Sequence, residues 1–219
     1  MHKYAIIVAG GSGTRMQSEL PKQFLELVGK PILMHTIDAF YFDDIQIILV
    51  LPADQITLWN SLCAQYSFSI PHTIVSGGAT RFNSVKNGLN SIAEETGIVA
   101  IHDGVRPLIK RETILNSFKE AENSGNAIVS VDCKDSLRKT SKDGNKAVRR
   151  EDYQLIQTPQ TFQISLIKAA FNTEHQSAFT DDASVLEHHG ETINLIPGDY
   201  RNIKITTPED LLVAESFLK

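Results

Sequence analysis

The chain has 219 residues, of which 42% are hydrophobic and 21% are charged, and its formal net charge is -5 at pH 7. This composition is typical of a folded globular protein and excludes a disordered chain. The acidic balance excludes a broad basic surface for nucleic acid, and no apolar stretch is long enough to span a membrane.

Cysteine usage and the amino-terminal segment indicate the compartment. The two cysteines, Cys63 and Cys133, lie far apart in the sequence, and no apolar signal segment follows Met1. We therefore expect a cytoplasmic protein with one domain over residues 1–219. Both cysteines are expected to be small packing or surface residues without a chemical role.

A short buried strand and a glycine-rich loop open the chain. The apolar run from Tyr4 to Val8 predicts a strand of a parallel sheet that is covered on both faces. The next loop has three glycines in four positions, which lets backbone N–H groups converge on one anion, and Arg15 and Lys22 add two positive charges. We interpret it as a polyphosphate site at the carboxyl end of the strand. Its predicted nucleotide-binding residues are Ala9, Gly10, Gly11, Ser12, Gly13 and Thr14.

Two common phosphate-binding motifs do not fit this loop. A Walker loop requires Lys followed by Ser or Thr after its last glycine, and no such pair follows Gly13. A dinucleotide fingerprint requires a third glycine where Met16 stands. Without Arg15 and the nearby Pro21-Lys22-Gln23, an ordinary strand-to-helix turn would explain the glycines equally well.

Alternating helices and strands follow. A helix is predicted from Ile32 to Phe40 with Pro31 at its first position, and then a strand from Ile45 to Leu51. Asp54 is expected to cap the next helix, which has an apolar inward face. This alternation predicts the α/β class with a doubly wound, mostly parallel sheet.

A second glycine loop follows the third predicted strand, His72 to Val75. The segment from Gly77 to Val85 then opens a helix that Asn83 or Ser84 can cap. Glycines leave a flat slot in which backbone groups can contact the edge of a pyrimidine. Two glycine loops at one edge of the sheet can therefore hold the two ends of a single nucleotide.

The fourth predicted strand, Ile98 to Ile101, leads into His102-Asp103-Gly104-Val105-Arg106-Pro107. An acidic residue beside phosphates would repel them unless it meets a divalent cation or a sugar hydroxyl. Asp103 is therefore a candidate for one of these contacts. The alternative is that Asp103 caps the following helix.

The segment from residue 132 to 151 differs in character from the rest of the chain. It is polar and rich in Lys and Arg, and Asp143-Gly144-Asn145 predicts a turn between two strand-like stretches. A two-stranded hairpin is not stable alone, so we expect this arm to lie against another surface. The chain returns to the core from Leu155 to Phe162, where Pro159 fixes an extended or turned backbone. A strand is predicted from Thr192 to Ile196, and the chain ends in a helix capped by Thr207.

Four motifs, in this order along the chain, resemble one family. They are Gly10-Gly11-Ser12-Gly13-Thr14-Arg15-Met16 with Pro21-Lys22-Gln23, His102-Asp103-Gly104-Val105-Arg106-Pro107, Thr158-Pro159-Gln160-Thr161-Phe162, and Asn202 to Leu211. The chain is similar to sugar-phosphate nucleotidyltransferases, in particular to the cytidylyltransferases that make CDP-activated alditols. The resemblance implies a Rossmann-like nucleotidyltransferase fold with a protruding β-hairpin dimerisation arm at residues 132–151.

The resemblance also implies a reaction and its residues. In the family, an alditol phosphate attacks the α-phosphorus of CTP and expels pyrophosphate, with Mg²⁺ bound mainly through the CTP phosphates. The implied catalytic residues are Arg15, Lys22, Arg150 and Lys204. Nucleotide contacts are implied for Gly78, Arg81, Ser84, Asp103 and Gly104. Substrate contacts are implied for Asp103, Arg106, Ser136, Arg150, Thr158, Thr180 and Lys204, and Asp103 is the candidate metal ligand.

The family also implies an assembly. Its arm crosses to the other subunit of a homodimer, where an arginine that matches Arg150 reaches the second active site. We accordingly expect a homodimer that binds CTP and an alditol phosphate, with no nucleic-acid or membrane partner.

Alternatives remain for two predictions, the identity of the alditol substrate and the catalytic activity. Thr180-Asp181-Asp182-Ala183-Ser184 and Asp135-Ser136-Leu137-Arg138 favour a methylerythritol phosphate as substrate, and ribitol 5-phosphate is the alternative. Arg201 stands where some members carry an acidic residue, so the contact with the alditol hydroxyls stays open. A non-catalytic nucleotide-binding module is disfavoured, because it would not need the catalytic lysines and arginines that this chain retains.

Overall fold

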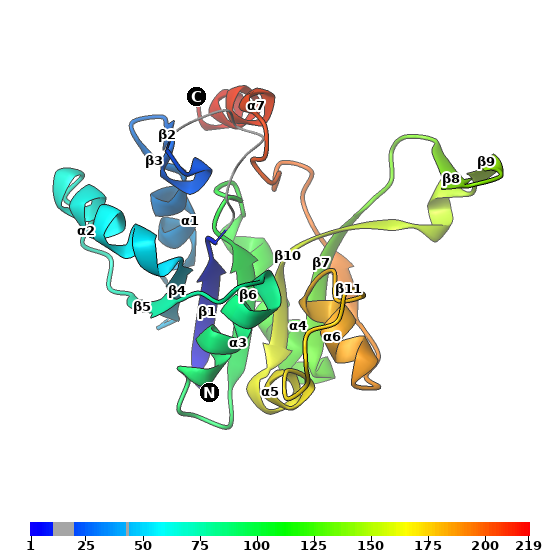
Figure 1. Cartoon of the computed structure of the whole chain (residues 1–219), viewed down its shortest axis with the longest axis horizontal. Coiled ribbons are helices and arrows are strands. Elements are labelled where there is room, and N and C mark those ends of the chain that lie inside the picture. The colour runs from blue at the N-terminus through cyan, green and yellow to red at the C-terminus, as the bar shows by residue number, and fades with distance from the viewer. Residues whose placement is uncertain (11–19, 43) are drawn as a thin grey trace.

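A seven-stranded sheet forms the centre of the protein (Figure 1). The computed structural model describes residues 1–10, 20–42 and 44–219. The sheet order is β11-β7-β10-β6-β1-β4-β5. The strands are β1 (Lys3–Val8), β4 (Gln46–Leu51), β5 (Thr73–Ser76), β6 (Ile98–Asp103), β7 (Asn126–Asp132), β10 (Gln154–Gln163) and β11 (Leu195–Pro197). Within this sheet β10 alone runs antiparallel to its neighbours, so the predicted doubly wound, mostly parallel sheet is confirmed.

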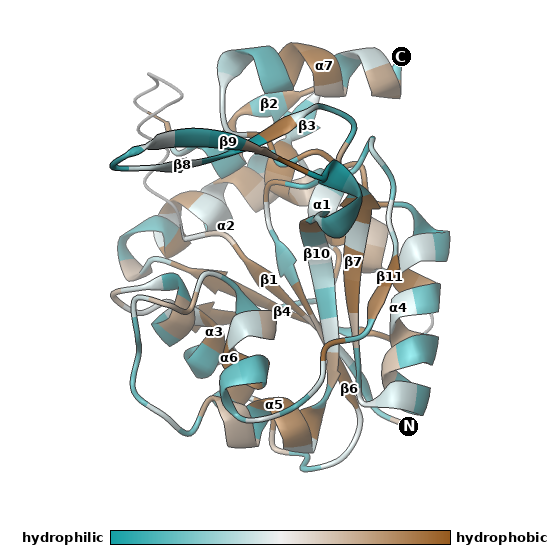
Figure 2. Cartoon of the chain, turned by 90° about the vertical axis from the view of Figure 1, so that its right-hand side faces the viewer, coloured by the Kyte–Doolittle hydropathy of each residue, from teal (hydrophilic) through white to brown (hydrophobic). Residues whose placement is uncertain are grey.

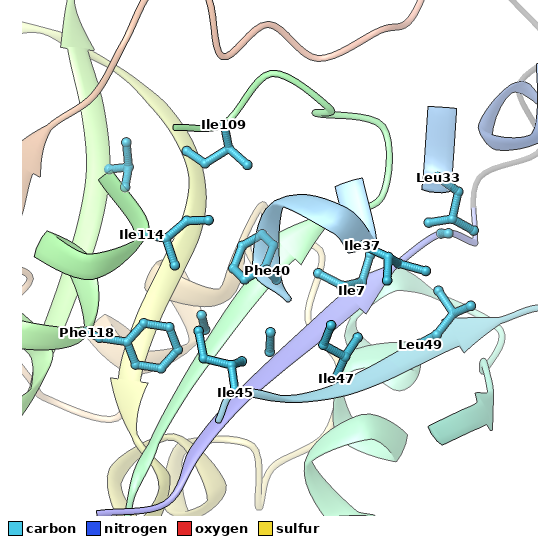
Figure 3. Packing of buried hydrophobic residues seen from close by; sticks show 14 of the residues in the cluster. Ile7, Leu33, Ile37, Phe40, Ile45, Ile47, Leu49, Ile109, Ile114 and Phe118 are labelled. Carbon is cyan, nitrogen blue, oxygen red and sulfur yellow. The ribbon is translucent and has the colours of Figure 1, made fainter. Parts of the chain in front are cut away.

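Helices cover both faces of the sheet. One face carries α1 (Ile32–Phe40), α2 (Ile56–Gln65) and α4 (Arg111–Ser124), and the other carries α3 (Arg81–Asn90), α5 (Ile164–Ala170) and α6 (Asp182–His188). Neighbouring residues of β1 point to opposite faces, so that Ile7 belongs to the first core cluster and Ile6 to the second. Figure 3 shows Ile7 beside Ile37 and Phe40 of α1. Burial on both faces explains why these strands are continuously apolar.

A third, smaller cluster lies beyond the carboxyl ends of the strands. It joins α7 (Pro208–Leu218) and the short strand β2 (Glu26–Leu27), which pairs with β3 (Lys30–Pro31), to the loop after β6. Its buried members are Leu27, Ile32, Val105, Ile205 and Ala214. The cluster therefore brings three distant loops together above one edge of the sheet.

The predicted hairpin consists of β8 (Leu137–Ser141) and β9 (Gly144–Val148), which form a separate two-stranded sheet. It projects away from the central sheet (Figure 1) and is strongly hydrophilic (Figure 2). Ser141 pairs with Gly144, so the turn lies at residues 142–143, earlier than predicted, and Gly144 has the positive φ of 125°. None of the residues 137–148 is buried.

Several helix starts differ from the prediction. Asp54 lies in the 3₁₀ helix η3 (Ala53–Gln55) and does not cap α2, because that helix begins only at Ile56. Thr80, not Asn83 or Ser84, caps α3, and its hydroxyl accepts the Asn83 N–H. Pro31 precedes the first residue of α1 and is not part of it.

The carboxyl-terminal elements also bear on the predictions. Thr207 caps α7 as expected, with Pro208 at the first helical position and a reciprocal hydrogen bond to Asp210. The last strand, β11, begins at Leu195, later than predicted. No helix in residues 1–10, 20–42 and 44–219 combines the length and apolar character needed to cross a bilayer.

Candidate active site

A pocket of about 290 Å³ lies over the carboxyl ends of β1 and β6. The chain leaves β1 toward β4 on one side and returns to β6 on the other, and Val8 pairs with Asp103 across this switch point. Open α/β sheets bind ligands at such a crevice. The lining residues are Val8, Ala9, Gly10, Lys22, Gln23, Gly78, Ala79, Thr80, Arg81, Ser84, Asp103, Val105 and Lys204. Eight of the predicted site residues therefore line one pocket: Ala9, Gly10, Lys22, Gly78, Arg81, Ser84, Asp103 and Lys204.

The first loop is described only at its two ends. Gly11, Ser12, Gly13, Thr14 and Arg15 lie outside the described residues.

The two ends of that loop are joined by a buried glutamine. Its side chain, Gln23 Nε2, donates to the Ala9 carbonyl at 2.9 Å and to Gln55 Oε1 at 2.7 Å. Gln23 thus fixes Ala9 and the neighbouring Lys22 on the same wall of the pocket. It belongs to the Pro-Lys-Gln motif, but its sequence neighbours gave no sign of this bond.

Two lysines meet at the pocket from opposite ends of the chain. Lys22 begins the 3₁₀ helix η2 (Lys22–Phe24), and its Nζ donates to the Ile205 carbonyl at 3.3 Å. Lys204, the residue before Ile205, places its Nζ 3.0 Å from Asp103 Oδ2. A phosphate group bound in the pocket can therefore meet positive charge from both lysines.

The second glycine loop folds onto the start of α3. The Gly78 N–H donates to Ser84 Oγ at 3.1 Å, and the Ser84 hydroxyl donates to the Thr80 carbonyl at 2.9 Å. A Cβ atom at Gly78 would lie 2.4 Å from the Cβ of Asn83. This close approach requires glycine and leaves a backbone-lined wall next to Gly10.

Arg81 forms the adjoining wall and is fixed by a buried acid. Its guanidinium donates to both carboxylate oxygens of Asp182 at 2.8 Å each, and Asp182 is 1% exposed. Such bidentate pairs hold the guanidinium in one orientation. Asp182 was missed as a site residue, because only the fold brings the start of α6 to the start of α3.

Asp103 lies at the centre of the charged groups. Its carboxylate faces Arg81 Nε at 3.7 Å, Arg106 Nε at 3.3 Å and Lys204 Nζ at 3.0 Å. Burial acts to raise its pKa, but Arg81, Lys204 and Arg106 outweigh burial and hold the pKa well below its usual range. Asp103 therefore stays ionised at neutral pH and is unsuited to act as a general acid or base.

His102, just before Asp103, is fully buried and bonded at both ring nitrogens. Nε2 lies 3.2 Å from the Arg106 carbonyl and donates to it, which leaves Nδ1 to accept from the Thr158 hydroxyl at 3.0 Å. Burial lowers the pKa of His102 from 6.5 to about 4. The neutral ring thus fixes the turn from Asp103 to Arg106.

This pKa shift predicts how stability depends on pH. The unfolded chain takes up the His102 proton near pH 6.5, whereas the folded protein takes it up only near pH 4, so stability falls as pH falls through this window. We expect His102 to cost on the order of 3 kcal/mol of unfolding free energy between pH 7 and pH 4. Urea unfolding at several pH values in this range measures how the unfolding free energy changes with pH, and His102→Asn is the matched variant. An equal change of unfolding free energy with pH in the two proteins would contradict the prediction.

Gly104, Thr158 and Thr180 lie around the pocket and do not line it. Gly104 is buried where a Cβ would lie 2.8 Å from that of Ala9. Thr158 is buried, and its Oγ1 accepts the Asp103 N–H at 3.1 Å. Thr180 is exposed beside a small hollow on the other side of Arg81.

The two predicted residues of the arm, Ser136 and Arg150, do not line the pocket. Ser136 is exposed just before β8. Arg150 is exposed after β9, and its Nη1 donates to the Lys134 carbonyl at 2.6 Å. The hollow beside Arg150 shares no lining residue with the pocket.

The described lining of the pocket offers a divalent cation a single carboxylate. Asp103 is the acidic residue among the described lining of the pocket, and no cluster of three or more metal-ligating side chains occurs in the described ranges. Mg²⁺ commonly binds through one carboxylate together with substrate phosphates and water. One carboxylate therefore fits a cation that arrives bound to a nucleoside triphosphate.

Comparisons with known proteins agree over nearly the whole chain. The family model for 2-C-methyl-D-erythritol 4-phosphate cytidylyltransferase matches residues 3–219. The chain is 50% identical over 220 residues to a protein of that name from Bacteroides fragilis, covering 100% of both chains. It is 49% identical over 217 residues to one from Phocaeicola vulgatus, covering 98% of this chain and 99% of the relative.

A solved structure shows the same architecture. The crystal structure of 4-diphosphocytidyl-2C-methyl-D-erythritol synthase from Anaerococcus prevotii is 30% identical, with a TM-score of 0.84. The match covers 99% of this chain and 96% of that chain.

Proposed function

Because the chain belongs to the family of 2-C-methyl-D-erythritol 4-phosphate cytidylyltransferases, we propose that its pocket is where CTP and this alditol phosphate react. The activity is transfer of CMP from CTP to 2-C-methyl-D-erythritol 4-phosphate, which gives CDP-methylerythritol and pyrophosphate. The observation that carries the proposal is the convergence of Lys22, Arg81 and Lys204 on one pocket at the switch point of the sheet.

The two ends of CTP occupy the two glycine loops. Cytosine lies against Gly78 and Ser84, where the backbone leaves a flat wall, and Arg81 is held beside it by Asp182. The triphosphate extends toward Gly10 and Lys22. Backbone N–H groups and a lysine are suited to this polyanion.

The alditol phosphate binds on the side of Lys204. An oxygen of this phosphate forms a bond to the α-phosphorus of CTP, and the bond from that phosphorus to the bridging oxygen breaks. Pyrophosphate leaves with the electron pair. The attacking phosphate is already anionic near neutral pH and needs no general base, so Lys22 and Lys204 act by orienting two anions and stabilising charge at phosphorus.

Mg²⁺ is proposed as the cofactor, carried mainly by the CTP phosphates. When bound, it supplies positive charge to the triphosphate. Asp103 is the residue proposed to contact it or the alditol.

We further propose that the hairpin serves a homodimer. β8 and β9 form only a two-stranded sheet, and a hairpin of this kind needs a third strand or an apolar surface to be stable. Tyr153, Leu155 and Ile156, just beyond it, are exposed apolar side chains suited to a subunit contact. Arg150 would then act in the second subunit's pocket.

The cytoplasmic location expected from the sequence also stays a prediction.

Pyrophosphate release from CTP, measured with each alditol phosphate in turn, tests the proposed function. We expect a value of kcat/KM for 2-C-methyl-D-erythritol 4-phosphate at least about tenfold above that for ribitol 5-phosphate, because a polar site leaves groups unpaired with the wrong alditol. A reversed preference would favour the ribitol alternative. CTP binding without turnover on either alditol phosphate would favour a non-catalytic nucleotide-binding module.

A further inference from the structure

Lys204 lies on a segment without regular structure. Residues 198–207 connect β11 to α7 and contain neither helix nor strand (Figure 1). The Ile205 N–H donates to the Val105 carbonyl at 2.9 Å just after Lys204, and side-chain contacts fix the backbone before it. The neighbouring Asn202 supplies several of these contacts.

The first contact joins this segment to the turn after β6. Arg106 Nη1 donates to the Asn202 carbonyl at 2.8 Å, while Arg106 Nε faces Asp103 Oδ2 at 3.3 Å. Arg106 thus bridges Asp103, which pairs with Lys204, and the backbone two residues before Lys204. Its removal would disturb both ends of this bridge.

The second contact joins the segment to β10. The side chain of Asn202 is fully buried, and its Nδ2 donates to the Thr158 carbonyl at 2.8 Å and to Gln157 Oε1 at 3.2 Å. Gln157 Nε2 in turn donates to the Asp199 carbonyl at 2.9 Å. The segment is therefore anchored to β10 at both residue 199 and residue 202.

The third contact closes a ring. Thr158, whose carbonyl accepts from Asn202, also accepts the Asp103 N–H with its Oγ1 at 3.1 Å. The ring runs from Asp103 through Arg106, Asn202 and Thr158 back to Asp103. It ties three segments that are distant in sequence into one unit with Lys204 at its edge.

We propose that Asn202 is a positioning residue for Lys204 in the transfer reaction. The proposal rests on the proposed function, in which Lys204 orients the attacking phosphate. Asn202 does not line the pocket, so it acts through the backbone of the segment that carries Lys204. Because misplacement of a reacting group by about 1 Å can cost on the order of 100-fold in rate, a side chain outside the pocket can have a large kinetic effect.

The test compares Asn202→Ala with Asn126→Ala. Asn126 is also buried and also joins two segments, donating to the Thr192 carbonyl at 2.9 Å and accepting the Asn194 N–H at 2.8 Å. It lies at the amino end of β7, whereas the pocket lies over the carboxyl ends of β1 and β6. Loss of Asn126 is thus expected to lower the melting temperature without changing the kinetics.

For Asn202→Ala we expect kcat/KM for 2-C-methyl-D-erythritol 4-phosphate to fall about 10- to 100-fold, while the Kd for CTP stays within about twofold. Gln157→Met, which removes two hydrogen bonds to the same segment, should shift the same parameter in the same direction. If Asn202→Ala does not fold, the Gln157→Met variant tests on its own whether this network positions Lys204.

Three outcomes would contradict the inference. Unchanged kinetics for the alditol phosphate in the folded Asn202 and Gln157 variants would overturn it and leave the proposed function intact. An equal loss in Asn126→Ala would show a general effect of stability and would also overturn it. A wild-type protein without CMP transfer would overturn both proposals.

Discussion

Replacing Lys22 with methionine is expected to lower kcat for CMP transfer by about 100-fold or more. Lys22 lines the pocket, and its ammonium lies beside the Ile205 carbonyl next to Lys204. In the proposed function it faces the α-phosphate and the departing pyrophosphate, where negative charge is redistributed in the transition state. Methionine keeps the length and apolar character of the stem but removes the charge.

Steady-state pyrophosphate release gives kcat, and calorimetry gives the Kd for CTP. Lys86→Met is the matched control, because Lys86 also donates to a backbone carbonyl, that of Thr173 at 3.1 Å, but does not line the pocket. We expect the control to turn over normally. A Lys22→Met variant with near-normal kcat and only weaker CTP binding would contradict the catalytic role.

The sequence predicted the parts of the fold that depend on local patterns. The run from Tyr4 to Val8 is apolar at every position because both faces of β1 are covered, and this pattern is readable without a structure. Asp103 was predicted at a strand end and stands there, as the last residue of β6. The alternative that it caps the next helix is wrong, because α4 begins only at Arg111 and Lys110 precedes it.

Contacts between distant segments could not be predicted in the same way. The pairing of Arg81 with Asp182 joins residues 101 positions apart, and neither residue's neighbours in sequence indicate the other. Likewise, Thr158 was expected to contact a ligand, but its hydroxyl is bonded to the Asp103 N–H and to His102. A buried threonine and an exposed one have the same local sequence signal, so only packing distinguishes them.

Helix starts were the weakest local predictions. Thr80, Asn83 and Ser84 are all good cap residues, and the choice among them depends on where the first hydrogen-bonded turn closes. Ser84 cannot cap α3, because its hydroxyl is used within the helix to bond the Thr80 carbonyl and to accept the Gly78 N–H. Ser84, inside the first turn of α3, therefore stabilises the predicted loop by accepting the Gly78 N–H.

Arg150→Ala is expected to lower kcat/KM for 2-C-methyl-D-erythritol 4-phosphate by about 100-fold, although Arg150 does not line the pocket of its own subunit. The expected cause is loss of a positive charge that the arm carries to the attacking phosphate in the second subunit. CTP binding should be unchanged, because the glycine loops are intact. Lys139→Ala, on the exposed β8 strand of the same arm, is the control for general disturbance of the hairpin.

Mixing two inactive variants separates action within a subunit from action across the dimer. When Lys22→Met and Arg150→Ala subunits exchange freely, about half of the dimers contain one of each. If Arg150 acts across the interface, one of the two sites in such a mixed dimer has both lesions and the other has none. Total activity should then recover to about a quarter of the wild-type value. If Arg150 acts only within its own subunit, every site keeps one lesion and activity stays at the level of the separate variants, which would refute the crossed arm.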